Sequence, residues 1–250
     1  MSKQKKDSNS HLNTKDTTIT MNMQQLLQLM HIHDSAFPIG TYTHSFGMET
    51  YIQQDKIKDP DTLFTYCYNY LHSNLSCGDG IFVKEVWQTL AQSKSFDSIY
   101  TLDAFCHAQK LAKESRAGST KMGRQFLETA VPLADSPMLS QWKEVVIANQ
   151  TYGHYAISYG LYAYIKGFSL PVTICSFLYS SVAGLIHNAV RAVPLGQTTG
   201  VRVINDILSH CEVETLAILE KNLDDLSNQA VGIELASMAH EFLYSRLFIS

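Results

Sequence analysis

The sequence predicts an all-α fold, a single domain of about ten packed helices around two central apolar helices. From Met21 onward apolar residues recur at helical spacing, and no stretch alternates apolar and polar residues between hairpin turns as strands do. At two places a proline directly follows a helix-capping residue, which is typical of a helix start. The chain has 250 residues, 45% of them hydrophobic and 17% charged, so it is long enough to bury a substantial core.

Residues 1–20 differ in composition from the rest of the chain. They contain four lysines and two aspartates among Ser, Asn and Thr, and such a segment cannot bury enough apolar surface to become ordered. We therefore expect a disordered polar tail at 1–20 and one all-helical domain at 21–250. The whole chain carries 19 Lys and Arg against 23 Asp and Glu, which gives no basic excess for binding nucleic acid.

The helices can be assigned in order along the chain. Met23, Leu26, Leu27 and Met30 share one side of a predicted first helix, at positions i, i+3, i+4 and i+7. Asp59 before Pro60 and Ser136 before Pro137 predict two further helix starts. Other helical runs carry Val83, Val86, Trp87 and Leu90; Phe96, Ile99 and Phe105; Leu111, Met122, Phe126 and Leu127; and Leu216, Leu219, Leu223 and Leu226.

Two long runs without charged residues predict the central helices. The first extends from Val145 to Ile165 and the second from Gly167 to Val190, with Gly167 placed as a helix C-cap. Each run is long enough to cross a bilayer, but both contain Asn, His, Ser and Thr residues that make insertion costly. We expect core helices, and a membrane pair remains the alternative.

Few sequence features indicate catalysis. His240-Glu241 begins like a zinc-protease motif, but Tyr244 stands where the second histidine belongs, and neither a P-loop nor a G-x-S-x-G elbow is present. Asp224 and Asp225 resemble half of an aspartate-rich magnesium site. The prediction is a protein that is not an enzyme and holds no cofactor or metal. The alternative is an all-α magnesium-dependent diphosphate transferase using Asp224 and Asp225.

Cysteine usage and the N-terminus predict the compartment. The five cysteines are odd in number, widely spaced and without a C-x-x-C pair, which argues against a disulfide framework. No apolar leader develops before Met21. We expect a cytoplasmic protein.

Four segments combine glycine, proline, arginine and aromatic residues. These residue types are suited to forming turns and contact surfaces and not to acid–base catalysis. The segments are the turn from Ser35 to Glu49, which leads into a helix that Thr43 or Ser45 could cap; Glu114 to Arg124; Asn188 to Gly200, after which a helix starts at Val201-Arg202; and His240 to Ser250. Chain ends are usually polar, so the last of these must dock either on its own domain or on a partner. Tyr and Arg are frequent anchors of protein interfaces, and both destinations stay open on composition alone.

Taken together and in this order, these segments resemble the family of urease accessory protein UreF. The resemblance rests on Pro38, Gly40, Ser45, Gly47 and Glu49; Arg116, Ser119 and Gly123; Gly153-His154; Arg191-x-x-Pro194-Leu195-Gly196-Gln197; and Tyr244-Ser245-Arg246-Leu247-Phe248. It implies an all-α, non-catalytic scaffold that forms a homodimer, binds UreD (also called UreH) and recruits the GTPase UreG, so that nickel reaches apo-urease. Control of the GTPase and a share in a nickel passage are further implied roles.

The resemblance also implies which residues bind partners. It places Tyr244, Arg246, Leu247 and Phe248 on UreD. It further implies contact surfaces or tunnel walls at Glu49, Arg191, Gln197 and Arg202.

Overall fold

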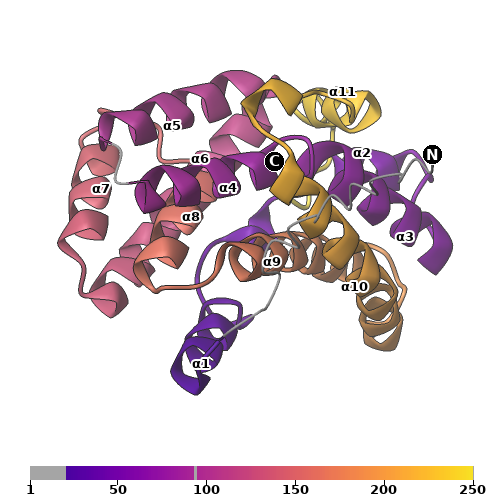
Figure 1. The fold of residues 1–250 in the computed structure, drawn as a ribbon. Coiled ribbons are helices and arrows are strands. Elements are labelled where there is room, and N and C mark those ends of the chain that lie inside the picture. The colour runs from indigo at the N-terminus through magenta and orange to yellow at the C-terminus, as the bar shows by residue number, and fades with distance from the viewer. Residues whose placement is uncertain (1–20, 93–94, 250) are drawn as a thin grey trace, which may run out of the picture.

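The computed structural model describes residues 21–92 and 95–249, and these form helices and no strands (Figure 1). The described part contains α1 (Met23–Ile32), α2 (Met48–Gln53), α3 (Pro60–Asn69), α4 (Asp79–Ala91), α5 (Asp97–Gln109), α6 (Lys113–Ala134), α7 (Pro137–Ile147), α8 (Tyr155–Ile165), α9 (Leu170–Ala192), α10 (Gln197–Glu220) and α11 (Val231–His240), with 3₁₀ turns η1 (Thr41–Thr43) and η3 (Leu223–Asp225) and a π-helical turn η2 (Tyr70–Leu75). The predicted all-α class is confirmed. The tail predicted at residues 1–20 lies outside the described residues.

Helix starts follow the capping chemistry in part. Asp59 Oδ1 accepts a hydrogen bond from the Thr62 amide at 2.8 Å, and α3 begins at Pro60 as predicted. The expected cap of α2 by Thr43 or Ser45 is wrong, because α2 begins after Gly47 with no side-chain cap. Gly47 has φ +89°, and a Cβ there would lie under 3 Å from atoms of α11, so only glycine fits this turn.

Helices α8 and α9 lie in the centre, where α8 packs against α4 and α6 and α9 packs against α10 and α4. The most apolar stretch of α9 is 56% buried by these neighbours, as in a core helix, although α9 has the length and hydropathy of a membrane span. Gly167, with φ +70°, follows the end of α8 as predicted.

The prediction of one helix over Val145–Ile165 is wrong. α7 ends at Ile147, and a loop separates it from α8, which begins at Tyr155. Asn149 and Gly153 adopt left-handed backbone conformations in this loop. The buried carboxylate of Asp103 on α5 accepts hydrogen bonds from the three consecutive backbone amides at positions 152–154. These bonds replace the backbone hydrogen bonds that a helix would make there. Likewise, the predicted run through Leu216 and Leu226 is broken, because α10 ends at Glu220.

Helix α1 forms where predicted, but its apolar side faces outward and not toward the core. Met23, Leu26, Leu27 and Met30 are exposed, whereas Ile32 is buried. Figure 1 shows α1 at the edge of the molecule, so that only part of its circumference meets the body. The name "α1 stripe" is used below for these four exposed side chains.

His33, directly after α1, predicts a pH dependence of stability. Its Nε2 lies 3.0 Å from the Tyr159 hydroxyl, and burial lowers its pKa to about 4. The unfolded chain binds a proton on this ring near pH 6.5 and the folded chain does not, so stability is lost as pH falls from 6.5 toward 4. At pH 5 this one site is expected to reduce the free energy of unfolding by about 2 kcal/mol relative to pH 7.

Urea unfolding at pH 7 and pH 5 measures the effect. The variant His33→Gln should lose less stability on acidification than the parent chain, by about that amount. An equal loss in both chains would contradict the assignment to His33.

Candidate partner-binding site at the C-terminal segment

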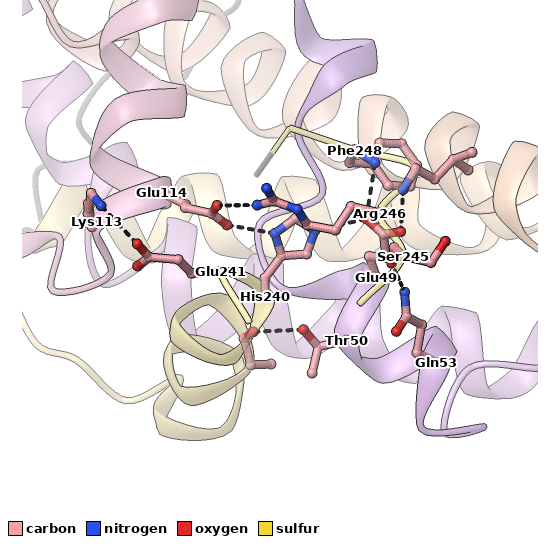
Figure 2. A network of polar contacts seen from close by, with 12 residues as sticks. Glu49, Thr50, Gln53, Lys113, Glu114, His240, Glu241, Ser245, Arg246 and Phe248 are labelled. Carbon is pink, nitrogen blue, oxygen red and sulfur yellow. Dashed lines mark hydrogen bonds and ion pairs between the residues drawn. The ribbon is translucent and has the colours of Figure 1, made fainter. Parts of the chain in front are cut away.

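The last residues fold back onto the body of the protein after α11 (Figure 2). In this C-terminal segment, Leu243–Ile249, the Ile249 amide donates to the Thr43 carbonyl at 2.8 Å. The side-chain amide of Gln53 on α2 donates to the Ser245 carbonyl at 2.6 Å. Phe248 is only 4% exposed. The segment is therefore docked on its own chain.

Glu49, in the first turn of α2, anchors the segment. Its carboxylate accepts hydrogen bonds from the Leu247 amide at 2.6 Å and the Phe248 amide at 3.1 Å, and contacts His240 Nε2 at 2.8 Å. The first turn of a helix favours a carboxylate, because the helix dipole is positive there. The turn at Gly47 thus sets this buried acid under the backbone of the chain end.

His240 and Glu114 extend the anchor across to α6. The Nδ1 of His240 lies 2.6 Å from Glu114 Oε2, and Arg246 Nη1 donates to Glu114 Oε1 at 2.9 Å. At the rim, Lys113 Nζ and Glu241 Oε1 form an ion pair at 2.8 Å. Figure 2 shows the His240 ring between the carboxylates of Glu114 and Glu49. Glu49, Glu114, His240 and Arg246 are called the C-terminal cluster below.

The segment divides into inward and outward side chains. Tyr244 is fully exposed and Leu247 largely so, whereas Phe248 and the anchoring Glu49 are buried. Glu49 and Phe248 make their contacts within the chain, and the partner contacts expected for them from the sequence stay a prediction. Arg246 is partly exposed and pairs with Glu114.

Helix α11 and the turn that follows it expose further apolar side chains. Val231, Leu235, Met238 and Phe242 are exposed at positions i, i+4, i+7 and i+11. Sequence reasoning missed this surface, although its helical spacing was legible in the sequence. The sequence also contains no sign of the anchoring role of His240, which stands there as the start of an incomplete zinc motif and of the C-terminal run.

The remaining predicted site residues lie elsewhere. Arg191 lies in the last turn of α9 and donates to the Tyr42 carbonyl at 3.3 Å. Gln197 is the first residue of α10, which begins there and not at Val201 as expected. Arg202 lines a surface hollow together with Phe64 and Asp206. The structure therefore brings Glu49 to the C-terminal segment. It also places Arg191 on the Tyr42 carbonyl, next to the Thr43 carbonyl that holds the Ile249 amide, whereas Gln197 and Arg202 lie on α10.

The carboxylates proposed for a magnesium site have a local structural role. Asp225 Oδ2 accepts from the Asn222 amide at 2.8 Å, and the Asp224 amide donates to Asn222 Oδ1 at 2.7 Å. Within residues 21–92 and 95–249, no three His, Cys, Asp or Glu side chains form a group that could hold a metal ion. The diphosphate-transferase alternative gains no support from this geometry.

Comparison with known proteins identifies the family. A sequence model of the UreF family matches residues 57–208. The urease accessory protein UreF of Sporosarcina pasteurii is 42% identical over 203 residues, which are 81% of this chain and all of the relative. That of Lachnoclostridium phytofermentans is 35% identical over 225 residues, covering 90% of this chain and 98% of the relative. The chain belongs to the UreF family.

Membership of the UreF family confirms the resemblance read from the sequence. Relatives in the family carry the name urease accessory protein, and this chain is a urease accessory protein of the UreF type. The region that the UreF model matches contains the Arg116 segment, Gly153-His154 and the Arg191 loop. It ends before the C-terminal segment.

Proposed function

We propose that the chain is a cytoplasmic scaffold of urease maturation, formed by one domain at residues 21–250. It forms a homodimer, binds UreD/UreH and recruits the GTPase UreG, and the assembly delivers nickel to apo-urease. Nickel is cargo in this scheme and the scaffold holds no cofactor. Control of UreG's GTPase activity and a share in the nickel passage are further parts of the proposal.

The C-terminal segment carries the proposal for UreD binding. A fully exposed tyrosine is held on a backbone that buried groups fix in place, and α11, which precedes the segment, exposes apolar side chains as well. Large aromatic side chains on an ordered backbone lose little entropy when a partner covers them. We assign Tyr244, Arg246 and Leu247 to the UreD contact, with Phe248 and Glu49 as their support.

The test is binding of UreD to variants of the segment. Tyr244→Ala is expected to weaken binding by about 1 to 4 kcal/mol, and a chain ending at Leu243 should form no stable complex. Tyr244→Ala should leave the unfolding free energy unchanged, because its side chain packs on nothing in the chain. Calorimetry and size-exclusion chromatography with light scattering measure these outcomes. Phe105→Ala, which removes an exposed ring on α5, is the control. Unchanged UreD affinity in both altered chains would overturn the assignment.

The α1 stripe supports the homodimer. Two copies carry the same net charge of −4, so they repel unless they meet at a surface without charge. Residues 21–33 contain no Asp, Glu, Lys or Arg, and the α1 stripe within them is apolar and exposed. A second copy of the chain is the occupant we propose.

Charge placed on the α1 stripe should separate the copies. Leu27→Glu with Met30→Glu is expected to weaken dimerisation by at least about tenfold while helix content is kept, since both side chains are exposed. Gln24→Glu adds charge to a polar, exposed position of the same helix and is the matched control. Light scattering across a concentration series measures the dimer. A double variant that dimerises like the control would remove α1 from the interface.

Arg191, Gln197 and Arg202 stay proposed contacts of this assembly. They lie in the last turn of α9 and the first turns of α10, and Arg191 binds the Tyr42 carbonyl next to the residue that holds Ile249.

A further inference from the structure

His240 is buried between two carboxylates, and its contacts require more hydrogen atoms than a neutral ring carries. Nδ1 lies 2.6 Å from Glu114 Oε2, and Nε2 lies 2.8 Å from Glu49 Oε2. An ionised carboxylate only accepts hydrogen bonds, and a neutral imidazole has a single N–H. One of the two short contacts would then bring lone pairs together. The cluster therefore holds one additional proton, because a ring that donates from both nitrogens satisfies both contacts.

The additional proton also balances charge. With the ring doubly protonated, His240 and Arg246 offset the charges of Glu49 and Glu114. Without it, one negative charge is in excess beside a ring that is wholly buried, and an uncompensated buried charge is costly. The charged groups that face this ring are Glu49 from α2, Glu114 from α6 and Arg246 from the C-terminal segment, with the Lys113–Glu241 pair at the rim.

The same carboxylates hold the C-terminal segment. The Glu49 carboxylate accepts hydrogen bonds from the Leu247 and Phe248 amides, and the Glu114 carboxylate accepts one from Arg246. Removal of the proton drives one carboxylate away from the ring. If Glu49 moves, it releases two backbone amides, and if Glu114 moves, it releases the arginine. Either movement weakens the attachment of the segment.

We propose that the C-terminal segment is a proton-dependent strap, docked when the His240 ring is doubly protonated and released when that proton is lost. Docking binds a proton, so the docked fraction falls as pH rises. The docked strap presents Tyr244 and Leu247 outward in a fixed arrangement. The consequence that UreD affinity falls with rising pH rests on the proposed function, whereas the strap itself does not.

Two substitutions distinguish the effect of the second His240 proton from the effect of the hydrogen bonds that hold the C-terminal segment. In Glu114→Gln the new amide can donate to Nδ1 of a neutral ring while its oxygen still accepts from Arg246, so no additional proton is needed. In the parent chain each Glu49 oxygen accepts a hydrogen bond from one backbone amide. In Glu49→Gln only one side-chain oxygen remains to accept these two hydrogen bonds. The first variant should keep the strap docked at any pH, and the second should loosen it at every pH.

Hydrogen exchange of the Leu247 and Phe248 amides in the full chain tests the proposal. Rates are expressed as protection factors, which removes the intrinsic effect of pH. Between pH 6 and pH 9 protection should fall by at least about tenfold in the parent chain. It should stay constant in Glu114→Gln and be low throughout in Glu49→Gln. Nitrogen chemical shifts of the His240 ring should show two protonated nitrogens at pH 6, and this measurement requires no variant.

Constant protection in the parent chain, or a ring with one bare nitrogen at pH 6, would overturn the strap. So would a Glu114→Gln chain as pH-sensitive as its parent. Titration of UreD against the parent chain at the two pH values then tests the consequence. A chain that shows the exchange transition but never binds UreD retains the strap and loses the proposed function.

Discussion

Replacement of Asp103 by alanine is expected to lower the free energy of unfolding by about 4 kcal/mol, because four donors, two of them buried, lose one shared acceptor together. The carboxylate is fully buried. Oδ2 accepts from the Thr151 hydroxyl at 2.6 Å and from the Tyr152 and Gly153 amides at 2.8 Å, and Oδ1 accepts from the His154 amide at 3.0 Å. No helix offers these amides another partner, because they lie in the loop between α7 and α8.

The effect should extend to the side chain of His154. Its ring is buried, with Nδ1 3.0 Å from Ser119 Oγ and Nε2 3.1 Å from His107 Nδ1, and burial holds its pKa well below the ordinary value. Once the loop loosens, these contacts lose their fixed geometry.

Chemical unfolding measures the loss, and Asp103→Asn provides the graded control. An asparagine oxygen at the Oδ2 position can keep three of the four bonds, so this variant should lose roughly half as much stability or less. If the alanine variant were as stable as the asparagine variant, the carboxylate would not be what orders the loop.

Gly123→Ala is expected to destabilise the protein by about 3 kcal/mol, although alanine normally favours a helix. Gly123 lies inside α6, where a Cβ would stand 1.9 Å from the Gly153 carbonyl oxygen and 2.9 Å from the His154 carbonyl carbon. Both obstacles are backbone atoms in the loop that Asp103 holds. Relief therefore requires α6 and α8 to move apart, and this separates packed core side chains.

The unfolding midpoint in urea measures this loss as well. Gln125→Ala, at an exposed position of the same helix, is the control and should change stability by less than about 0.5 kcal/mol. A Gly123→Ala chain as stable as this control would show that the contact between α6 and the loop yields easily.

Fold class and several helix boundaries could be predicted from the sequence because their causes are local. Asp59 and Pro60 start α3 by satisfying or removing free amides of the first turn, and Gly167 ends α8 by adopting a left-handed conformation. Neither cause depends on a distant residue. The family could be recognised for a related reason, since separate short segments in a fixed order are visible without coordinates.

The side of a helix that is buried, and the ends of apolar runs, could not be predicted in the same way. The α1 stripe has the spacing of a core surface, yet α1 lies at the edge of the molecule and exposes it. The run from Val145 to Ile165 has helical composition throughout, yet Asp103, more than forty residues earlier, binds its middle as a loop. Local propensity is weak compared with several buried hydrogen bonds.

The sequence by itself determined that this chain is helical, which family it belongs to and which chain end carries an unusual set of aromatic residues and arginine. Only the tertiary structure decided that Glu49 and Phe248 are buried and that Tyr244 faces outward. Glu49 and His240 are 191 positions apart and meet through the packing of α2 on α11. A contact of that separation depends on the summed packing of all helices between its partners, so periodicity and motifs, which act over a few turns, do not contain it.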